Sequence, residues 1–155
     1  MLTVDGQFGP EPYSIQYTAN TTNKGTGAAG GAFFSYTAPE GSTVTDVQPG
    51  EGWTCKVSSD KRYLSCETTT PIPPQGSAPP VVFVVKSPKG STPQPFEATV
   101  TPRDELGFAR TDANPADNTV TKSFDVSDAK LAGNGFGCTV AAPRSEGLAP
   151  FGALA

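Results

Sequence analysis

Histidine is absent from this 155-residue chain, and there are only three cysteines and one methionine. Without histidine, the chain lacks the commonest general base of enzymes and the commonest protein ligand of zinc. Nucleophiles that depend on histidine are excluded, and no glycine-rich phosphate loop follows a predicted strand. Paired carboxylates for glycoside hydrolysis would meet only in space, and the sequence nominates no pair. We therefore expect a protein that is not an enzyme and that needs no cofactor.

Clustered positive charge and long apolar runs are also missing. The chain has 11 Lys and Arg against 15 Asp and Glu, a formal net charge of −4, and its cations are scattered. This pattern provides no basic patch for nucleic acid or anionic lipid. No run approaches the roughly 18 apolar residues of a membrane-spanning helix. Residues 1–5 lack the regions of a signal peptide, so the chain is mature, excised from a longer one, or intracellular, and its composition favours export.

Glycine and proline are abundant instead, with 17 and 16 copies. Such turn residues separate short segments in which apolar and polar side chains alternate, and no amphipathic helix is present. Residues 81–85 are apolar on both faces, which is typical of a strand at the centre of its sheet. The pattern predicts an all-β fold, a two-sheet antiparallel β-sandwich of about seven to eight strands. The expected core consists of Tyr17, Phe34, Trp53, Val57, Leu64, Phe83, Val100 and Phe124.

Residues 52–66 predict a β-hairpin that carries the single tryptophan. Trp53 and Cys55 alternate with polar residues on the first arm, and a polar tip precedes the return arm. Folding the arms about residues 59–62 places Cys66 opposite Cys55, so we predict a disulfide between them. The alternative is a pair of buried free thiols, which the exported character of the chain makes the weaker hypothesis.

The sequence predicts one domain with a tail, because the chain is long enough for one core and too short for two comfortable ones. We assign the sandwich to residues 1–127. From residue 128 the alternation stops and small residues predominate, so we assign residues 128–155 to a Gly-rich linker and tail.

Several short motifs occur in an order that resembles a known family. They are Tyr13-Ser14-Ile15, Asn23-Lys24-Gly25, Ala38-Pro39-Glu40-Gly41, Gly52-Trp53-Thr54-Cys55, Leu64-Ser65-Cys66, Phe96-Glu97-Ala98-Thr99-Val100 and the stretch 112–119. In order and spacing they resemble the Ig-like repeat of bacterial and archaeal surface proteins, a family catalogued as a domain of unknown function. The resemblance covers residues 10–126 and implies an Ig-like sandwich on a secreted or wall-anchored chain. The chain departs from the family's pattern at Asp117-Asn118, where paired Asn is usual, and in its short first strand, residues 2–4.

Residues 135–140 are similar to the Gly-Cys segment that opens C-terminal sorting signals of Gram-negative exported proteins. Such signals continue with a membrane-spanning run and basic residues, which do not follow here. Either the signal is truncated, so that membrane anchoring acts through a C-terminal segment not present in this chain, or the likeness is accidental. Cys138 is accordingly a candidate for lipidation or attachment, and its alternatives are pairing between chains and an idle thiol.

Oxygen-bearing side chains concentrate in the segment that precedes the last predicted strand: Asp104, Glu105, Asp112, Asp117 and Asn118. Calcium requires such ligands, but their spacing fits no EF-hand loop. Asx side chains in turns commonly cap backbone groups instead. We expect turn capping and no metal, with calcium at Asp104, Asp112 and Asp117 as the alternative.

The aromatic side chains allow two interpretations. Trp53, Tyr13, Tyr17, Tyr36 and Tyr63 could stack against sugar rings as a platform. Their phase matches that of the other apolar residues, which favours packing in the core.

These observations favour an extracellular or cell-surface structural or adhesive module. Its expected partners are other protein chains, through self-association or neighbouring domains, and nucleic acid is not expected. A more specific hypothesis is a surface fibre in which the short first strand or the tail completes a neighbour's sheet by β-strand addition. The alternative is a carbohydrate- or ligand-binding β-sandwich module.

Overall fold

The computed structural model describes residues 1–89 and 94–124, and the account below concerns that part of the chain. It contains nine strands and one short 3₁₀ helix. These are β1 (Leu2–Phe8), β2 (Ser14–Thr21), β3 (Gly31–Thr37), β4 (Thr43–Gln48), β5 (Trp53–Val57), β6 (Tyr63–Thr68), β7 (Val81–Lys86), β8 (Gln94–Arg103), η1 (Pro115–Asn118) and β9 (Thr119–Phe124). No helix in the described ranges has the length and apolar character needed to cross a membrane.

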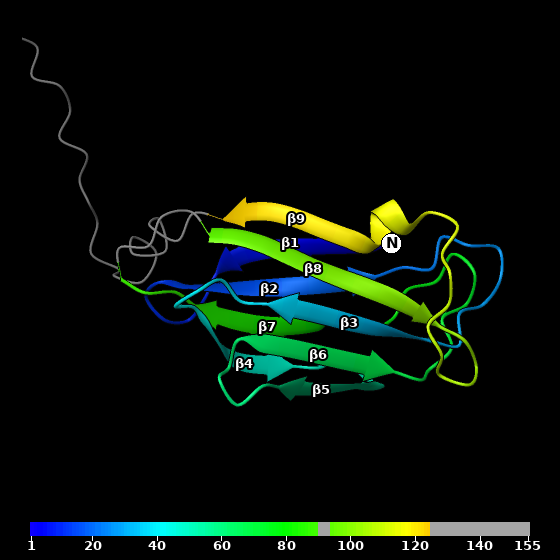
Figure 1. Cartoon of the computed structure of the whole chain (residues 1–155), viewed down its shortest axis with the longest axis horizontal. Helices are drawn as coiled ribbons and strands as arrows, with labels where there is room; N and C mark the ends of the chain where they lie inside the picture. The colour runs from blue at the N-terminus through cyan, green and yellow to red at the C-terminus, as the bar shows by residue number, and fades with distance from the viewer. Residues whose placement is uncertain (90–93, 125–155) are drawn as a thin grey trace, which may run out of the picture.

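The strands form two layers, which face each other as a sandwich (Figure 1). One sheet has the order β1-β2-β7-β4 and the other β5-β6-β3-β8-β9. All neighbouring strands are antiparallel. The predicted two-sheet antiparallel sandwich is therefore confirmed, with nine strands rather than seven to eight.

Aromatic rings from both sheets form the centre of the core. Tyr17 of β2 lies with its ring centroid 4.5 Å from that of Phe96 of β8, and Tyr36 of β3 lies 5.0 Å from Phe83 of β7. Each of these four side chains is at most 3% exposed. Burial of a large apolar side chain is worth about 1.5–3 kcal/mol, so this cluster fastens the sheets together. Burial also raises the pKa of both tyrosine hydroxyls far above the ordinary value.

Most of the expected core is confirmed. Tyr17, Phe34, Trp53, Leu64, Phe83 and Val100 are buried, and Phe124 is partly buried against them. The doubly apolar segment becomes β7, which lies between β2 and β4 as predicted. Val57 is the exception, since its side chain is 39% exposed. It is the last residue of β5, and β5 is an edge strand, so the opposite sheet does not cover it.

The first strand is longer than expected. Rather than a short segment at residues 2–4, β1 runs for seven residues and pairs with β2 along its whole length. Its outer edge lies beside β9, because the Lys122 Nζ donates a hydrogen bond to the Val4 carbonyl (2.6 Å). Gly6 permits a second close contact, since a Cβ there would stand 2.4 Å from the Phe124 ring. The expectation of a weakly held first strand is therefore wrong.

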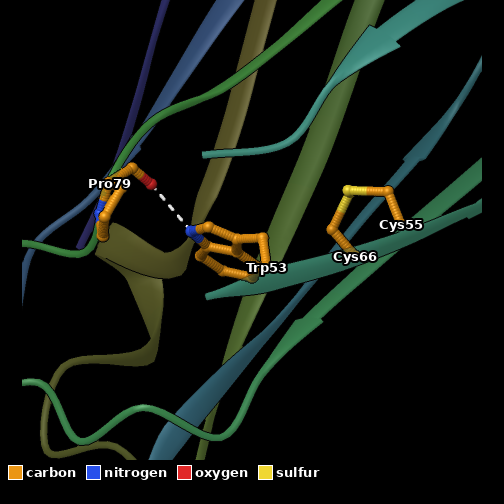
Figure 2. Close-up of a disulfide and its surroundings, with 4 residues drawn as sticks. All are labelled: Trp53, Cys55, Cys66 and Pro79. Atoms are coloured by element: carbon orange, nitrogen blue, oxygen red, sulfur yellow. Dashed lines mark hydrogen bonds between the residues drawn. A yellow bond between two sulfur atoms is a disulfide. The ribbon is translucent and has the colours of Figure 1, made fainter. Parts of the chain in front are cut away.

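The predicted hairpin is present and carries the predicted disulfide. Cys55 of β5 stands directly opposite Cys66 of β6 in the strand register, and their sulfurs are bonded. The bond joins neighbouring strands of one sheet (Figure 2). Beside it, Trp53 is 7% exposed and its Nε1 donates to the Pro79 carbonyl at 2.7 Å. This hydrogen bond ties β5 to the connection that enters β7 in the other sheet.

The predicted domain boundary at residue 127, the tail 128–155 and Cys138 lie outside the described residues. The assignment of the sandwich to residues 1–127 stays a prediction, although the described strands end at Phe124.

Loss of the disulfide is expected to destabilise the sandwich without changing its fold. A Cys55→Ala/Cys66→Ala variant should lose about 2–4 kcal/mol of unfolding free energy, because the unfolded chain regains the entropy of a closed loop. Urea unfolding followed by Trp53 fluorescence measures this loss, with Cys138→Ser in both proteins. Equal transition midpoints for the oxidised protein and the double variant would show that the bond contributes nothing.

Candidate functional site

The connections at one end of the sandwich surround a hollow of about 300 Å³, which we call the end hollow. The loops β2–β3 and β8–β9 supply most of its wall, and both lie at the right-hand end in Figure 1. Its floor is apolar and includes Ala29, Ala32, Ile72, Val100 and Pro102. The hollow exists because residues 25–32 contain only glycine, alanine and one threonine. No large side chain of this segment fills the end of the core.

The side chain of Asn23 holds the β2–β3 loop in shape. Its Nδ2 donates to the carbonyls of Gly27 (2.8 Å) and Ile72 (3.0 Å), and its Oδ1 accepts the Gly25 N–H (2.9 Å). One side chain thus bonds to two positions of its own loop and to the connection between β6 and β7. The hollow is therefore bounded by a loop with fixed hydrogen bonds.

On the opposite wall, Asp112 organises the segment before β9. Its carboxylate accepts the backbone N–H of Asn114 and the Nδ2 of Asn118, both at 2.9 Å. These two hydrogen bonds, the backbone one first, hold the pKa of Asp112 below its ordinary value. Asp117 accepts the Nδ2 of Asn114 at 3.1 Å. Asp112 thus caps a backbone group, as the capping prediction expected, whereas Asp117 accepts from a side-chain amide.

Asp104 belongs to a separate turn, residues 104–108, which we call the apolar tip. The Asp104 Oδ1 accepts the N–H groups of Leu106 (2.9 Å) and Phe108 (2.8 Å). Gly107 has a φ of +84°, a conformation that favours glycine. The Arg103 guanidinium donates to the Gly107 carbonyl at 2.6 Å and also lies over the Phe33 ring, 5.1 Å from its centroid. The turn is therefore fastened to β8 and to the outer face of β3.

The apolar tip exposes two large side chains that sequence reasoning missed. Leu106 is 82% exposed and Phe108 is 66% exposed, the highest values among large apolar residues of the described part. The signal was present, since two large apolar residues flank a glycine in a segment without alternation.

The three candidate calcium ligands do not form one site. Asp104 caps the apolar tip, whereas Asp112 and Asp117 serve the loop before β9. Within residues 1–89 and 94–124, no three His, Cys, Asp or Glu side chains form a group suited to a metal ion.

Most of the aromatic residues proposed for sugar stacking are buried. Tyr17, Tyr36 and Trp53 are buried, and only Tyr63, 41% exposed, presents much of its ring to solvent. Tyr13 is half-buried and precedes β2. The five aromatic residues therefore do not form a platform.

Removing the Asp112 carboxylate should destabilise the wall of the end hollow. Asp112→Asn is expected to cost about 1 kcal/mol near neutral pH, because the two hydrogen bonds lose their charged acceptor. A lowered folded-state pKa means that this stabilisation is complete above the unfolded carboxyl value, near 4, and disappears as pH falls through the folded value. Thermal unfolding from pH 7 to pH 2 should show the gap closing at the acid end. Glu51→Gln is the control, and a gap that is as large at pH 2 as at pH 7 contradicts this interpretation.

Comparison with known proteins places this architecture among Ig-like folds. No family model and no curated protein matches the chain. Among solved structures, the collagen-binding domain of a Staphylococcus aureus adhesin aligns with a TM-score of 0.53 at 8% identity, over 80% of this chain and 96% of that one. A Nocardia farcinica protein described as having an immunoglobulin-like fold aligns with a TM-score of 0.55 at 15% identity, over 80% and 97%.

A pilin shares the same architecture. BcpA, the major pilin subunit of Bacillus cereus, aligns with a TM-score of 0.51 at 7% identity, over 81% of this chain and 40% of the pilin. The structural neighbours thus include adhesin and pilin domains of bacterial surface proteins. Identities this low show the fold alone, and the fold of this chain is an Ig-like β-sandwich.

Proposed function

We propose that this chain is a structural and adhesive module of an extracellular or cell-surface protein, and that it works through mechanical and surface contacts with other protein chains. The Ig-like fold that it shares with adhesin and pilin domains supports this proposal. The absence of histidine from the sequence removes the usual acid–base chemistry. The Cys55–Cys66 disulfide is of a kind that persists in oxidising compartments outside the cytosol.

The observation that carries the proposal is the path of the chain through the sandwich. β1 and β9 lie side by side and run in the same direction, since Val4 meets Lys122 and, two residues further along each strand, Gly6 meets Phe124. The chain therefore enters at the end that holds the end hollow, and β9 ends at the opposite end (Figure 1). A domain of this shape transmits tension along its long axis, as a spacer or array unit must.

Tension along this path loads two complete strand ladders in shear. Pulling at the two ends drags β1 along β2, where seven residue pairs are in register, and β9 along β8, where six are. Sliding a strand requires many ladder hydrogen bonds to break together, whereas peeling breaks them one at a time. We therefore infer that the fold resists end-to-end force.

The fibre hypothesis needs a different edge from the one first expected. β1 is fully paired and its outer side meets β9, so it is a poor acceptor for a donated strand. The outer sides of β4 and β5 are the remaining candidates, because β4 pairs only with β7 and β5 pairs only with β6. Strand addition by a neighbouring chain stays a prediction, and it would have to use one of these edges.

Single-molecule stretching tests the proposed mechanical role. Handles at residues 1 and 124 should require a higher unfolding force than handles at residues 10 and 124, which lie at the same end of the sandwich and peel the strands apart. A similar force for both geometries would contradict the proposal.

Reduction of the disulfide gives an internal control in the same experiment. In the oxidised chain, the disulfide prevents the segment between Cys55 and Cys66 from extending under force. Reduction should therefore lengthen the unfolded chain by ~35 Å, from the 11 residue steps that separate the cysteines. An unchanged length would mean that the bond is not formed in the folded protein.

A further inference from the structure

The apolar tip displays an amphipathic surface that is held in place rather than frayed. Leu106 and Phe108 point into solvent from a turn that Asp104 and Arg103 fasten. Between them and Asp104 stands Glu105, which is exposed and whose carboxylate has no hydrogen bond or ion pair within the described ranges. Large exposed apolar side chains of this kind commonly mark interaction sites. The tip therefore offers two apolar groups and one free negative charge.

The end hollow is complementary to the tip, since it combines an apolar floor with positive charge at its rim. Its floor contains the buried side chains of Ala32, Ile72 and Val100. Lys24 and Arg110 stand at its rim, are exposed, and have side-chain charges without an ion-pair partner in the part of the chain that the structure describes. The acidic residues nearby are already engaged within the loop before β9. The hollow thus fits a ligand that combines apolar side chains with a carboxylate.

We propose that the end hollow receives the apolar tip of a second copy of this chain. Both features lie at the same end of the sandwich, where the loops β2–β3 and β8–β9 gather (Figure 1). Two copies related by a twofold axis can therefore exchange tips, each placing Leu106 and Phe108 against the other's apolar floor. Glu105 of each copy then approaches Lys24 and Arg110 of the other. The tip does not occupy its own hollow, as the exposure of Leu106 and Phe108 shows.

This pairing deepens the proposed function by naming one adhesive partner. The contact involves only the end of a small domain, so it falls in the class of small, transient interfaces. We expect a dissociation constant of about 10–500 µM for the isolated chain. Display of many copies on facing surfaces or in an array would strengthen the attachment through effective concentration.

Sedimentation velocity from about 10 µM to about 1 mM tests the pairing directly. The wild-type chain should shift from monomer to dimer across this range. A Leu106→Ser/Phe108→Ser variant should weaken the dissociation constant by about tenfold or more, because both apolar anchors are lost. The matched control is Phe8→Ser, since Phe8 is 46% exposed and lies at the opposite end. It should pair as the wild type does.

A large side chain at the end hollow should also prevent pairing, because it obstructs the surface that receives the tip. Gly27 lines the hollow, a Cβ there meets no atom within 4 Å and its φ is not positive, so Gly27→Trp adds a large side chain at the wall of the hollow without backbone strain. This variant should remain monomeric at about 1 mM while keeping its unfolding temperature. Ser59→Trp, at the tip of the β5–β6 hairpin, is the control and should still dimerise.

Charge-reversal variants distinguish this specific pairing from non-specific association. Glu105→Lys alone and Lys24→Glu/Arg110→Glu alone should each weaken self-association by about fivefold, because like charges then meet. Mixing the two variants should restore opposite charges at both contacts of the mixed dimer, so the mixed dimer should form in preference to either homodimer. Absence of the mixed dimer contradicts the arrangement.

Two further results would overturn the proposal. One is a wild-type chain that stays monomeric at about 1 mM, in which case the tip and the hollow do not recognise each other. The other is a Leu106→Ser/Phe108→Ser variant that dimerises as strongly as the wild type. Neither result affects the stretching experiment, so failure of the pairing and failure of the mechanical role are separable.

Discussion

The ring cluster of Tyr17, Tyr36, Phe83 and Phe96 is the interaction on which the rest of the structure depends. Its members come from β2, β3, β7 and β8, the inner strands of both sheets. Because these rings hold the layers together at the centre, the edge strands can serve other purposes. β5 carries the disulfide, β1 and β9 form the path of the chain through the domain, and the connecting loops shape the ends.

The two ends of the sandwich differ in what fills them. At the end with the β5–β6 hairpin, local capping closes the turn, and the Ser58 hydroxyl is the first cause of the lowered pKa of Asp60. At the other end the Gly- and Ala-rich segment leaves the end hollow open, while the Asp104 carboxylate holds Leu106 and Phe108 outside it. A fold that buries its aromatic residues so completely, yet fixes two large apolar side chains in solvent, invites association at that end.

Alternation of side chains predicted the layers, the central β7 and the Cys55–Cys66 pairing, because these depend on which residues share one face of a strand. It failed for β1, because Gly6 interrupts the face that Leu2, Val4 and Phe8 share, although the backbone pairs with β2 throughout. It also missed the end hollow, which arises where loops that are distant in sequence meet. Asp104 and Asp112 cap turns as expected, but the capping prediction gave no indication that the Asp104 turn displays apolar side chains.

The central claim is that the described chain passes through one cooperative sandwich, with β1 held between β2 and the side chains of β9. Native-state hydrogen exchange of the β1 amides tests it most directly, because local opening and global unfolding give different protection. We expect the amides of Thr3 and Asp5, which face β2 in the strand register, to exchange only through global unfolding, as those of β7 do. Exchange of these β1 amides through local fraying, while β7 stays protected, would contradict it.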